Sequence, residues 1–514
     1  MILRPDRELT VVNFFAGIGG CALGMKWAGF KSLGSFDLDE KALRDLQRLT
    51  GGPVFVCNLA LVKLAQLLGW VPICPDVVIM SPPCKKFSDL LPPEQAAAAE
   101  YIEMAQLALA GIYLACETWA PKLPAIIVLE NVRGITGARG AEILAQIVSL
   151  LTRYGYVIDQ SMHDCGEIGG IAQHRDRFLL VARQPEVAQD YLRRPPKQRV
   201  KNVGEVFEQL PSPLADHGDE LHQLPRTSAM TAVRLACVDP NRVVSLKSKG
   251  DWRDIPDRVR CVWGPVPERV MVRPKEGKSK QAGKHGVTGW DQPSHTVVGR
   301  GAREPARTVV GHASHDNSTS SYADPKVGKA AGWRSDPHRG SFGVESQARP
   351  ASTVRGRHDP RTAPAAVVDD RGWPVPTHYL VIEDGEHVLY GPELDLKSHK
   401  PIVVIILAPD GTWHRPMTDR ELAVLQGFPV DAYFEGPSST RAAQKPDARH
   451  PNRPYRPAVP GRREHIGNAI PPPTAHAIGL MIAECLRSPR RATFLRGPDV
   501  WVRRDEARME ASPT

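Results

Sequence analysis

The segment NFFAGIGGCALG, residues 13–24, joins the end of an apolar run to the start of a helical pattern through three glycines. Missing side chains at Gly17, Gly19 and Gly20 let backbone N–H groups and the N-terminus of a following helix approach a ligand. The same glycines would also suit a tight turn that binds nothing. The segment by itself therefore predicts a strand, a turn and a helix, and leaves ligand binding as one of two interpretations.

The same alternation continues along the first 185 residues. Apolar runs followed by helical patterns are ELTVVNFF, KSLGSFDL, DVVIM and AIIVLENV, and RFLLVAR is the final run. Strands regularly separated by helices predict βαβ units in a parallel, doubly wound sheet, with DVVIM as the central strand. Because the runs are apolar throughout, we expect helices on both faces of this sheet.

Length and composition limit the class of protein. A chain of 514 residues exceeds one ordinary core, which favours two domains. No apolar run is long enough to cross a membrane and no signal peptide is evident, so we expect a soluble protein of the cytoplasm. The nine cysteines include no CxxC pair, which favours reduced thiols. The spacing of His312, His315 and His338 is irregular, so we expect no metal site.

Positive charge is concentrated in the middle of the chain. Residues 242–361 contain 23 Lys/Arg against 12 Asp/Glu, whereas the formal net charge of the whole chain is +9. This segment favours a polyanionic partner, although a solvated basic surface is the alternative. Three similar stretches, QPSHTVVG (292–299), EPARTVVG (304–311) and RPASTVRG (349–356), predict short strands rather than a disordered linker.

Two further segments narrow the ligand and the chemistry. Asp37 in FDLDE lies at the tip of the second strand, where a carboxylate can accept both hydroxyls of a ribose. Because no phosphate-gripping lysine accompanies the glycines, S-adenosylmethionine is favoured over a nucleotide. In SPPCKKFS, residues 81–88, two prolines hold Cys84 in an extended loop and two lysines favour its thiolate, so Cys84 is a candidate nucleophile. A chance loop cysteine is the alternative.

Charged residues also end the next apolar run and precede the last one. Glu130 and Asn131 close the run AIIVLENV, beside the cysteine loop if the two strands are neighbours. A catalytic acid or a structural hydrogen bond would both account for Glu130. Arg175 and Arg177 are two residues apart, so we expect both to point to one side and to suit an anion.

Taken in order, these motifs resemble those of the cytosine-C5 methyltransferase family. The matching segments are FFAGIGG, FDLDE, PPC, ENV, the pattern Q-x-R-x-R at residues 173–177, TDRELAVLQGFP and IGNAIPPPTAHAIG. The resemblance implies a Rossmann-like catalytic domain in residues 1–185, completed by residues 415–487. It also implies an inserted, loop-rich and mainly β target-recognition domain in residues 186–414, and residues 488–514 are left as a basic tail.

The resemblance implies roles for individual residues. Cys84 would add to C6 of cytosine, Glu130 would neutralise the charge that develops at N3, and Asn131 would orient Glu130. The flipped base would be held by Arg175 and Arg177. Further substrate contacts are expected from Lys85, Ser88 and Gln173. The implied donor site consists of Phe15, Gly17, Gly19, Gly20, Asp37, Asn58, Pro83 and Asn468.

Two residues depart from the family pattern. Lys85 follows the proposed nucleophile where the family usually has Gln, and Asn58 stands where an Asp commonly binds the adenine amino group. The carbonyl oxygen of Asn58 can still accept that hydrogen bond. One threonine among Thr296, Thr308 and Thr353 is expected to approach the flipped base.

The resemblance implies a monomeric bacterial or phage enzyme, dependent on S-adenosylmethionine, that acts on double-stranded DNA. Two alternatives stay open. The same chemistry could act on a structured RNA, although the RNA-methylating branch of the family usually has a smaller recognition domain. A catalytically idle DNA-binding relative is the other alternative, and the complete set of Cys84, Glu130, Gln173, Arg175 and Arg177 argues against it.

Overall fold

The fold is described from a computed structural model. The residues that it describes are 7–83, 99–188, 192–213, 218–229, 232, 243–244, 259–265, 320–324, 342–346, 376–383, 386–396, 401–407, 413–438, 461–487, 494–496 and 501–503. Cys84, Lys85, Ser88 and the three TVVG-like stretches lie outside these residues.

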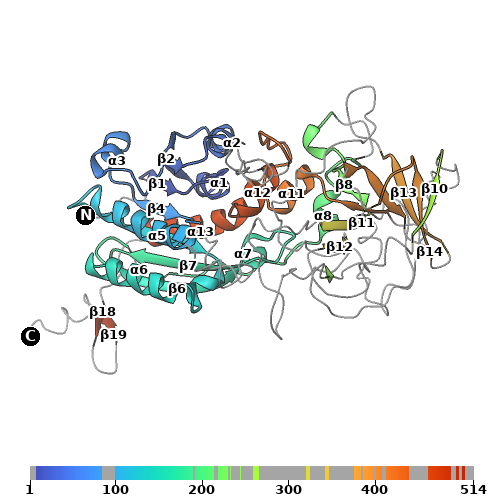
Figure 1. The fold of residues 1–514 in the computed structure, drawn as a ribbon. Helices are drawn as coiled ribbons and strands as arrows, with labels where there is room; N and C mark the ends of the chain where they lie inside the picture. Colours follow the sequence, from blue (N-terminus) through green and yellow to red (C-terminus); the bar gives the residue numbers. More distant parts are fainter. Residues whose placement is uncertain are drawn as a thin grey trace, which may run out of the picture.

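A seven-stranded sheet forms the first lobe (Figure 1), with the strand order β3-β2-β1-β4-β5-β7-β6. The strands are β1 (Leu9–Phe14), β2 (Phe30–Asp37), β3 (Val54–Val56), β4 (Val77–Met80), β5 (Ile126–Asn131), β6 (Val157–Asp164) and β7 (Asp176–Arg183). β1 to β5 pair in parallel. The five strands predicted in the first 185 residues are all present, and β4 is the central one.

The prediction of an entirely parallel sheet is wrong at one strand. β7 runs antiparallel to both β5 and β6. The physical reason is the short connection from β6 to β7, which holds only the five-residue helix α7 (Cys165–Gly169). A parallel neighbour needs a crossover of a dozen or more residues that packs back on the sheet, whereas an antiparallel neighbour needs only a turn.

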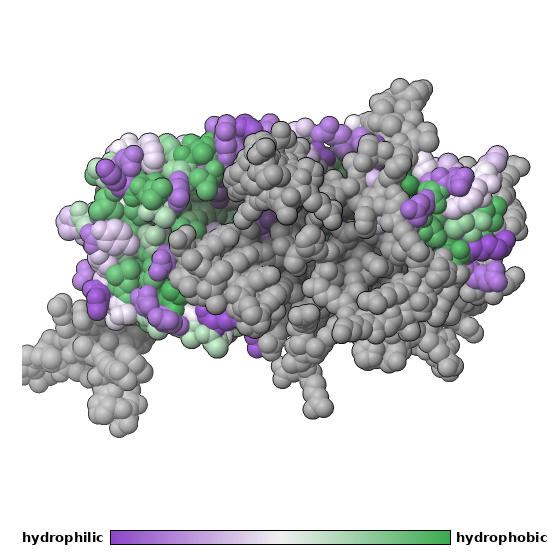
Figure 2. All heavy atoms as spheres, in the orientation of Figure 1, coloured by the Kyte–Doolittle hydropathy of each residue, from purple (hydrophilic) through white to green (hydrophobic). Residues whose placement is uncertain are grey.

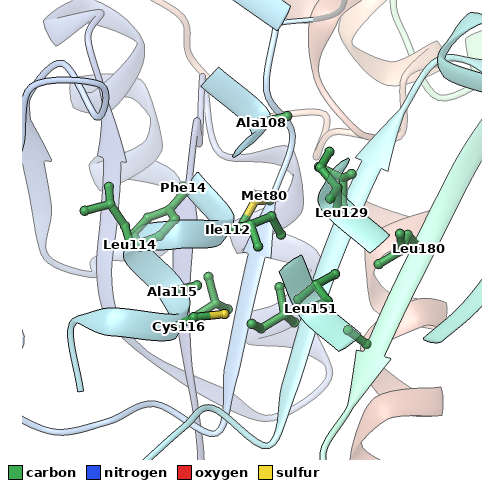
Figure 3. Packing of buried hydrophobic residues seen from close by; sticks show 14 of the residues in the cluster. Phe14, Met80, Ala108, Ile112, Leu114, Ala115, Cys116, Leu129, Leu151 and Leu180 are labelled. Carbon is green, nitrogen blue, oxygen red and sulfur yellow. The ribbon is translucent and has the colours of Figure 1, made fainter. Parts of the chain in front are cut away.

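Helices cover both faces of this sheet, as the apolar strands predicted. They are α1 (Gly20–Trp27), α2 (Glu40–Thr50), α3 (Leu64–Trp70), α5 (Ala99–Glu117), α6 (Ala141–Arg153) and α13 (Pro472–Arg487). On one face, Phe14, Met80 and Leu129 pack against Ile112 of α5 and Leu151 of α6 (Figure 3). The alternate residues of the same strands face the other way. There Val11, Ile79 and Val128 pack against side chains of α1 and α13.

The end of the chain therefore belongs physically to the first sheet. α13 packs against α1 and α7, and it buries Ile478, Ile482 and Cys485. Gly24 has no side chain, which allows α1 and α13 to approach closely. A Cβ at this position would lie 2.5 Å from the Cβ of Ala475. The proposed division into domains stays a prediction, but residues 472–487 clearly complete the core of the first lobe.

The second lobe is mainly β and lies at the other end of the molecule (Figure 1). Its eight-stranded sheet has the order β10-β14-β13-β16-β17-β11-β12-β9. These strands are β9 (Val243–Val244), β10 (Val259–Trp263), β11 (Ser320–Asp324), β12 (Phe342–Ser346), β13 (His378–Glu383), β14 (Glu386–Gly391), β16 (Val404–Leu407) and β17 (Trp413–Pro416). β8 (Thr227–Ser228) pairs with β15 (Pro401–Ile402). Separately, β18 (Phe494–Arg496) pairs with β19 (Trp501–Arg503).

Short helices join the two lobes: α8 (Val203–Phe207), α11 (Asp419–Leu425) and α12 (Arg462–Asn468). Thr418 caps α11, and buried Asp419 accepts hydrogen bonds from Arg462 and Arg463 at 3.0 and 2.7 Å. Because these arginines begin α12, the Asp419 carboxylate ties α11 to α12. This joint fixes α12 beside the carboxyl edge of the first sheet.

Among the described residues, no helix is both long and apolar enough to span a membrane. Exposed apolar side chains such as Leu61, Leu68 and Ile73 occur around α3. Figure 2 accordingly shows green residues among purple ones at the end of the molecule that carries α3.

Candidate active site

A cavity of about 450 Å³ opens at the carboxyl ends of β1, β2, β4 and β5. Its wall includes five of the predicted donor-site residues, Phe15, Gly17, Asp37, Asn58 and Pro83, and a sixth, Asn468, comes from α12. Three predicted catalytic residues, Glu130, Asn131 and Arg177, line the same cavity. The crevice beyond the strand ends is where open α/β sheets bind ligands.

The turn after β1 and the tip of β2 are tied together by Asp37. Its Oδ2 accepts a hydrogen bond from the backbone N–H of Gly17 at 2.8 Å, and its Oδ1 accepts one from Asp39 at 2.9 Å. Burial raises the pKa of the Asp37 carboxyl, although these two backbone bonds act in the opposite direction. Gly17 has a φ of 51° and Phe15 a φ of 54°, so the turn depends on left-handed backbone even at a non-glycine residue.

The other two glycines of this turn make room for neighbouring segments. A Cβ on Gly19 would lie 2.5 Å from Cγ of Leu46, and one on Gly20 would lie 2.1 Å from the carbonyl oxygen of Ile470. Neither glycine lines the cavity. The prediction that both contact the donor is therefore not supported by the geometry, because their missing side chains make room for α2 and for the segment after α12.

Asn58 lines the same cavity. Its Oδ1 accepts a hydrogen bond from the N–H of Ala60 at 3.0 Å, which fixes the amide against the loop. Leu38, whose exposed fraction is 68%, lines the cavity nearby and was not predicted. An exposed leucine between two aspartates carries no sequence signal that separates it from an ordinary surface residue.

The proline loop and the ENV segment are in direct contact. Nδ2 of Asn131 donates to the carbonyl of Pro82 at 3.4 Å, and Oδ1 of Asn131 accepts from the N–H of Val132 at 2.8 Å. β4 and β5 are neighbours, which confirms the condition set for the sequence prediction. Pro83, the residue before Cys84, lines the cavity.

Glu130 is paired with Arg177. Arg177 Nε lies 2.9 Å from Glu130 Oε1, and the exposed fractions of the two side chains are only 4% and 9%. Arg177 Nη1 also donates to the carbonyl of Asp176 at 2.9 Å. The arrangement holds the Glu130 carboxylate in place at the wall of the cavity.

Arg175 lies apart from Arg177. It does not line the cavity; its Nη1 donates to the carbonyl of Gly467 at 2.8 Å and its Nη2 to that of Ala469 at 3.1 Å. Gln173 is likewise fully buried, and its Nε2 donates to Oε1 of Gln426 at 2.8 Å. The structure thus does not bring Arg175 and Arg177 to one anion. Only Arg177 faces the cavity, whereas Arg175 and Gln173 support the segments behind it.

Two residues of the wall form an ion pair that the sequence did not predict. His465 Nε2 lies 3.1 Å from Asp39 Oδ2, and both residues line the cavity. Although burial raises the pKa of Asp39, hydrogen bonds from His465, Ala42 and Lys41 outweigh it and lower this pKa to about 2. Burial lowers the pKa of His465, but the hydrogen bond and the charge of Asp39 dominate and raise it.

Within the part of the chain that the structure describes, no group of three or more His, Cys, Asp or Glu side chains is arranged to hold a metal ion. His312, His315 and His338 lie outside that part. A monomeric state and a cytoplasmic location stay predictions.

The sheet order, the reversed seventh strand and the cavity at the strand ends define a Rossmann-like fold of the S-adenosylmethionine-dependent methyltransferase type. Residues 9–241 match the model of the C-5 cytosine-specific DNA methylase family.

The chain is also similar to individual proteins. The Type II methyltransferase M.AplI of Arthrospira platensis is 30% identical over 179 residues, which are 34% of this chain and 46% of that protein. M.PspPI of Psychrobacter is 24% identical over 332 residues, which are 63% of this chain and 71% of that protein. The chain spans about half the length of most of the curated relatives it matches. A solved prophage-encoded DNA modification methyltransferase (E. coli) is 16% identical, with a TM-score of 0.45, covering 94% of this chain and 100% of that one.

Proposed function

We propose that the protein transfers a methyl group from S-adenosylmethionine to C5 of cytosine in double-stranded DNA. The observation that carries the proposal is the single cavity that joins Asp37 and Phe15 at one end to Pro83, Glu130 and Arg177 at the other. A methyl transfer needs donor and acceptor in contact within one enclosed site. The match of residues 9–241 to the model of the C-5 cytosine-specific DNA methylases supports the substrate class.

The residues at the donor end fit an adenosine. Asp37 is held by two backbone N–H groups, and its remaining lone pairs can accept the ribose hydroxyls. Phe15 and Leu38 offer apolar surface to the adenine. The Oδ1 of Asn58 accepts one hydrogen bond from Ala60 and has a second lone pair for the adenine amino group. When bound, S-adenosylmethionine supplies an electrophilic methyl group.

At the acceptor end, the chain's own residues make C5 of cytosine nucleophilic. The thiolate of Cys84 forms a bond to C6, and the electron pair of the C5–C6 double bond becomes available at C5. Glu130, in its protonated form, gives its proton to N3 or shares it, which neutralises the negative charge that develops there, and Asn131 fixes the loop against β5. After C5 is methylated, its proton leaves to a base and the Cys84 thiolate is eliminated, which restores the double bond.

DNA binding is assigned to the second lobe and the basic segment. Residues 186–414 contain most of the strands of the eight-stranded sheet and the segment rich in Lys and Arg. Phosphate contacts from these cations would supply affinity, and base contacts would supply specificity. Cytosine C6 is hidden in a duplex, so the target base has to leave the stack before Cys84 reaches it.

The test is methyl transfer from labelled S-adenosylmethionine to unmethylated duplex DNA, with a structured RNA offered in parallel. We expect 5-methylcytosine in the DNA, no product with Cys84→Ser, and full activity with the control Cys261→Ser. Cys261 lies in β10 of the second lobe and does not line the cavity. Methylation of the RNA alone, or equal activity of the two serine variants, would contradict the proposal.

A further inference from the structure

The wall of the cavity contains one polar bridge between two distant parts of the chain. His465 of α12 and Asp39 at the start of α2 are 426 residues apart in sequence, yet Nε2 and Oδ2 lie 3.1 Å from each other. The two side chains are mostly buried, with exposed fractions of 13% and 28%. A charged hydrogen bond in such surroundings is stronger than one at the surface.

Asp39 connects this bridge to the proposed ribose-binding carboxylate. Its Oδ1 accepts hydrogen bonds from the N–H groups of Lys41 and Ala42 and so caps α2. Its own N–H donates to Oδ1 of Asp37 at 2.9 Å. A displacement of Asp39 would therefore move one of the two N–H groups that orient Asp37.

His465 connects the bridge to the other wall. It lies three residues before Asn468 in α12, so both side chains are on one face of the helix, and both line the cavity. The far end of α12 is held from behind, because Arg175 binds the carbonyls of Gly467 and Ala469. The pair of His465 and Asp39 holds the side of α12 that faces the cavity.

We propose that His465 is a positioning residue that, in its protonated form, holds α12 against the N-terminus of α2 and thereby sets the affinity for the methyl donor. The inference rests on the proposed function, since it names a determinant of the same donor site. It makes donor binding dependent on pH.

The charges around His465 determine the sign of this dependence. Asp39 and Asp45 face it from α2, and Glu464 precedes it in α12; all three favour the protonated imidazole and raise its pKa against the effect of burial. Because this pKa is raised, the ion pair is complete at low pH and is lost as pH rises through it. Asp39 stays ionised throughout, since its pKa is about 2. Donor affinity should therefore fall on the alkaline side.

The experiment measures the dissociation constant of S-adenosylhomocysteine, an unreactive probe, by calorimetry on the full chain from about pH 6 to about pH 9. For the wild type we expect a rise of about tenfold in this constant, which equals about 1.4 kcal/mol. His465→Gln keeps a side-chain N–H donor but does not titrate, so its dissociation constant should change much less with pH. Asp39→Asn keeps a good helix cap but removes the charge, so binding should be weak even at low pH.

His476→Gln is the matched control. His476 lies in α13, stacks edge-on against Trp27 and does not line the cavity. This variant should keep the wild-type pH profile. Thermal unfolding of each variant separates lost positioning from lost folding.

Two outcomes distinguish the inference from the proposed function. If the wild type binds the probe and His465→Gln keeps its pH profile, the positioning role is overturned while the proposed function stands. If the wild type binds no probe at any pH, the donor assignment fails and both proposals fall with it. A coupling energy near zero in the double-mutant cycle of Asp39→Asn and His465→Gln would also overturn the inference.

Discussion

The guanidinium of Arg177 lies beside the carboxylate of Glu130 on the neighbouring antiparallel strand, with Nε 2.9 Å from Oε1. β5 supplies the acid and β7 supplies the cation. The reversal of β7 brings its first residues to the edge where β5 ends. Had β7 run parallel to β5, residue 177 would lie at the opposite edge of the sheet.

Arg177→Met should destabilise the protein strongly. It leaves the Glu130 carboxylate buried without its cation, which typically costs about 3 kcal/mol of unfolding free energy. Chemical denaturation measures the change. Arg193→Met is the control, because Arg193 pairs with Glu484 on the surface and such pairs contribute about 1 kcal/mol or less. Equal losses for the two variants would contradict a buried ion pair.

Glu130→Gln should separate catalysis from donor binding. The amide cannot share a proton with N3 of cytosine, so the methyl-transfer rate should fall by about a hundredfold or more. The dissociation constant of S-adenosylhomocysteine should stay within about twofold, since the donor end of the cavity is unchanged. Single-turnover kinetics and calorimetry give the two values. A normal rate would remove Glu130 from the mechanism.

Gly20→Ala should destabilise the fold through packing. Its Cβ would lie 2.1 Å from the carbonyl oxygen of Ile470, so α1 and the segment after α12 must separate. We expect a loss of about 2 kcal/mol. Gly69→Ala is the control, because a Cβ there meets nothing within 4 Å and alanine favours the helix α3. The sign of the two changes, read from thermal unfolding, should be opposite.

Arg175→Lys should raise the KM for the donor more than it lowers kcat. Lysine carries a single ammonium and cannot bind the carbonyls of Gly467 and Ala469 in the same forked geometry. The wall that carries Asn468 would lose support, and a rise of about tenfold is expected. Arg199→Lys, at an exposed pair with Glu205, should change neither constant. A fall in kcat alone would instead indicate direct contact with the base.

The pair of His174 and Asp164 should contribute stability only within a window of pH. The hydrogen bond to Asp164 raises the pKa of His174, so its contribution is present at low pH and lost as pH rises through that pKa. Burial opposes the shift of Asp164, but its bonds to His174 and to the N–H of Arg175 lower its pKa, so its contribution disappears in acid.

The unfolding free energies of the wild type and His174→Gln should therefore differ most between about pH 4 and about pH 6.5. Urea denaturation across this range measures the difference. A difference that keeps growing above neutral pH would show that the imidazole acts in its uncharged form.

The sequence predicted the elements whose signal is local. Buried strands such as β4 and β5 are continuous apolar runs, and carboxylates at their ends, such as Glu130, stand out against them. β3 was missed because it has only three residues. β6 was missed because it is an edge strand, and its sequence VIDQSMHD contains the exposed Val157 and Met162 among polar residues.

The site was predictable only as far as position in the sheet decides it. Asp37, Glu130 and Asn131 line the cavity because the ends of parallel strands meet at one edge. The hydrogen bonds of Arg175 were not predicted because its carbonyl acceptors are 292 and 294 residues away. Spacing within a motif carries no information about contacts made by the returning end of the chain.

Because α12 and α13 pack against the first lobe, its cavity and core are complete only after these helices have been synthesised. A ribosome delivers β1 to β7 long before it delivers residues 461–487, so a growing chain lacks His465, Asn468 and the helix that covers one face of its sheet. A product that stops before α12 contains the segment that begins with Cys84 but lacks the part of the cavity wall that α12 supplies.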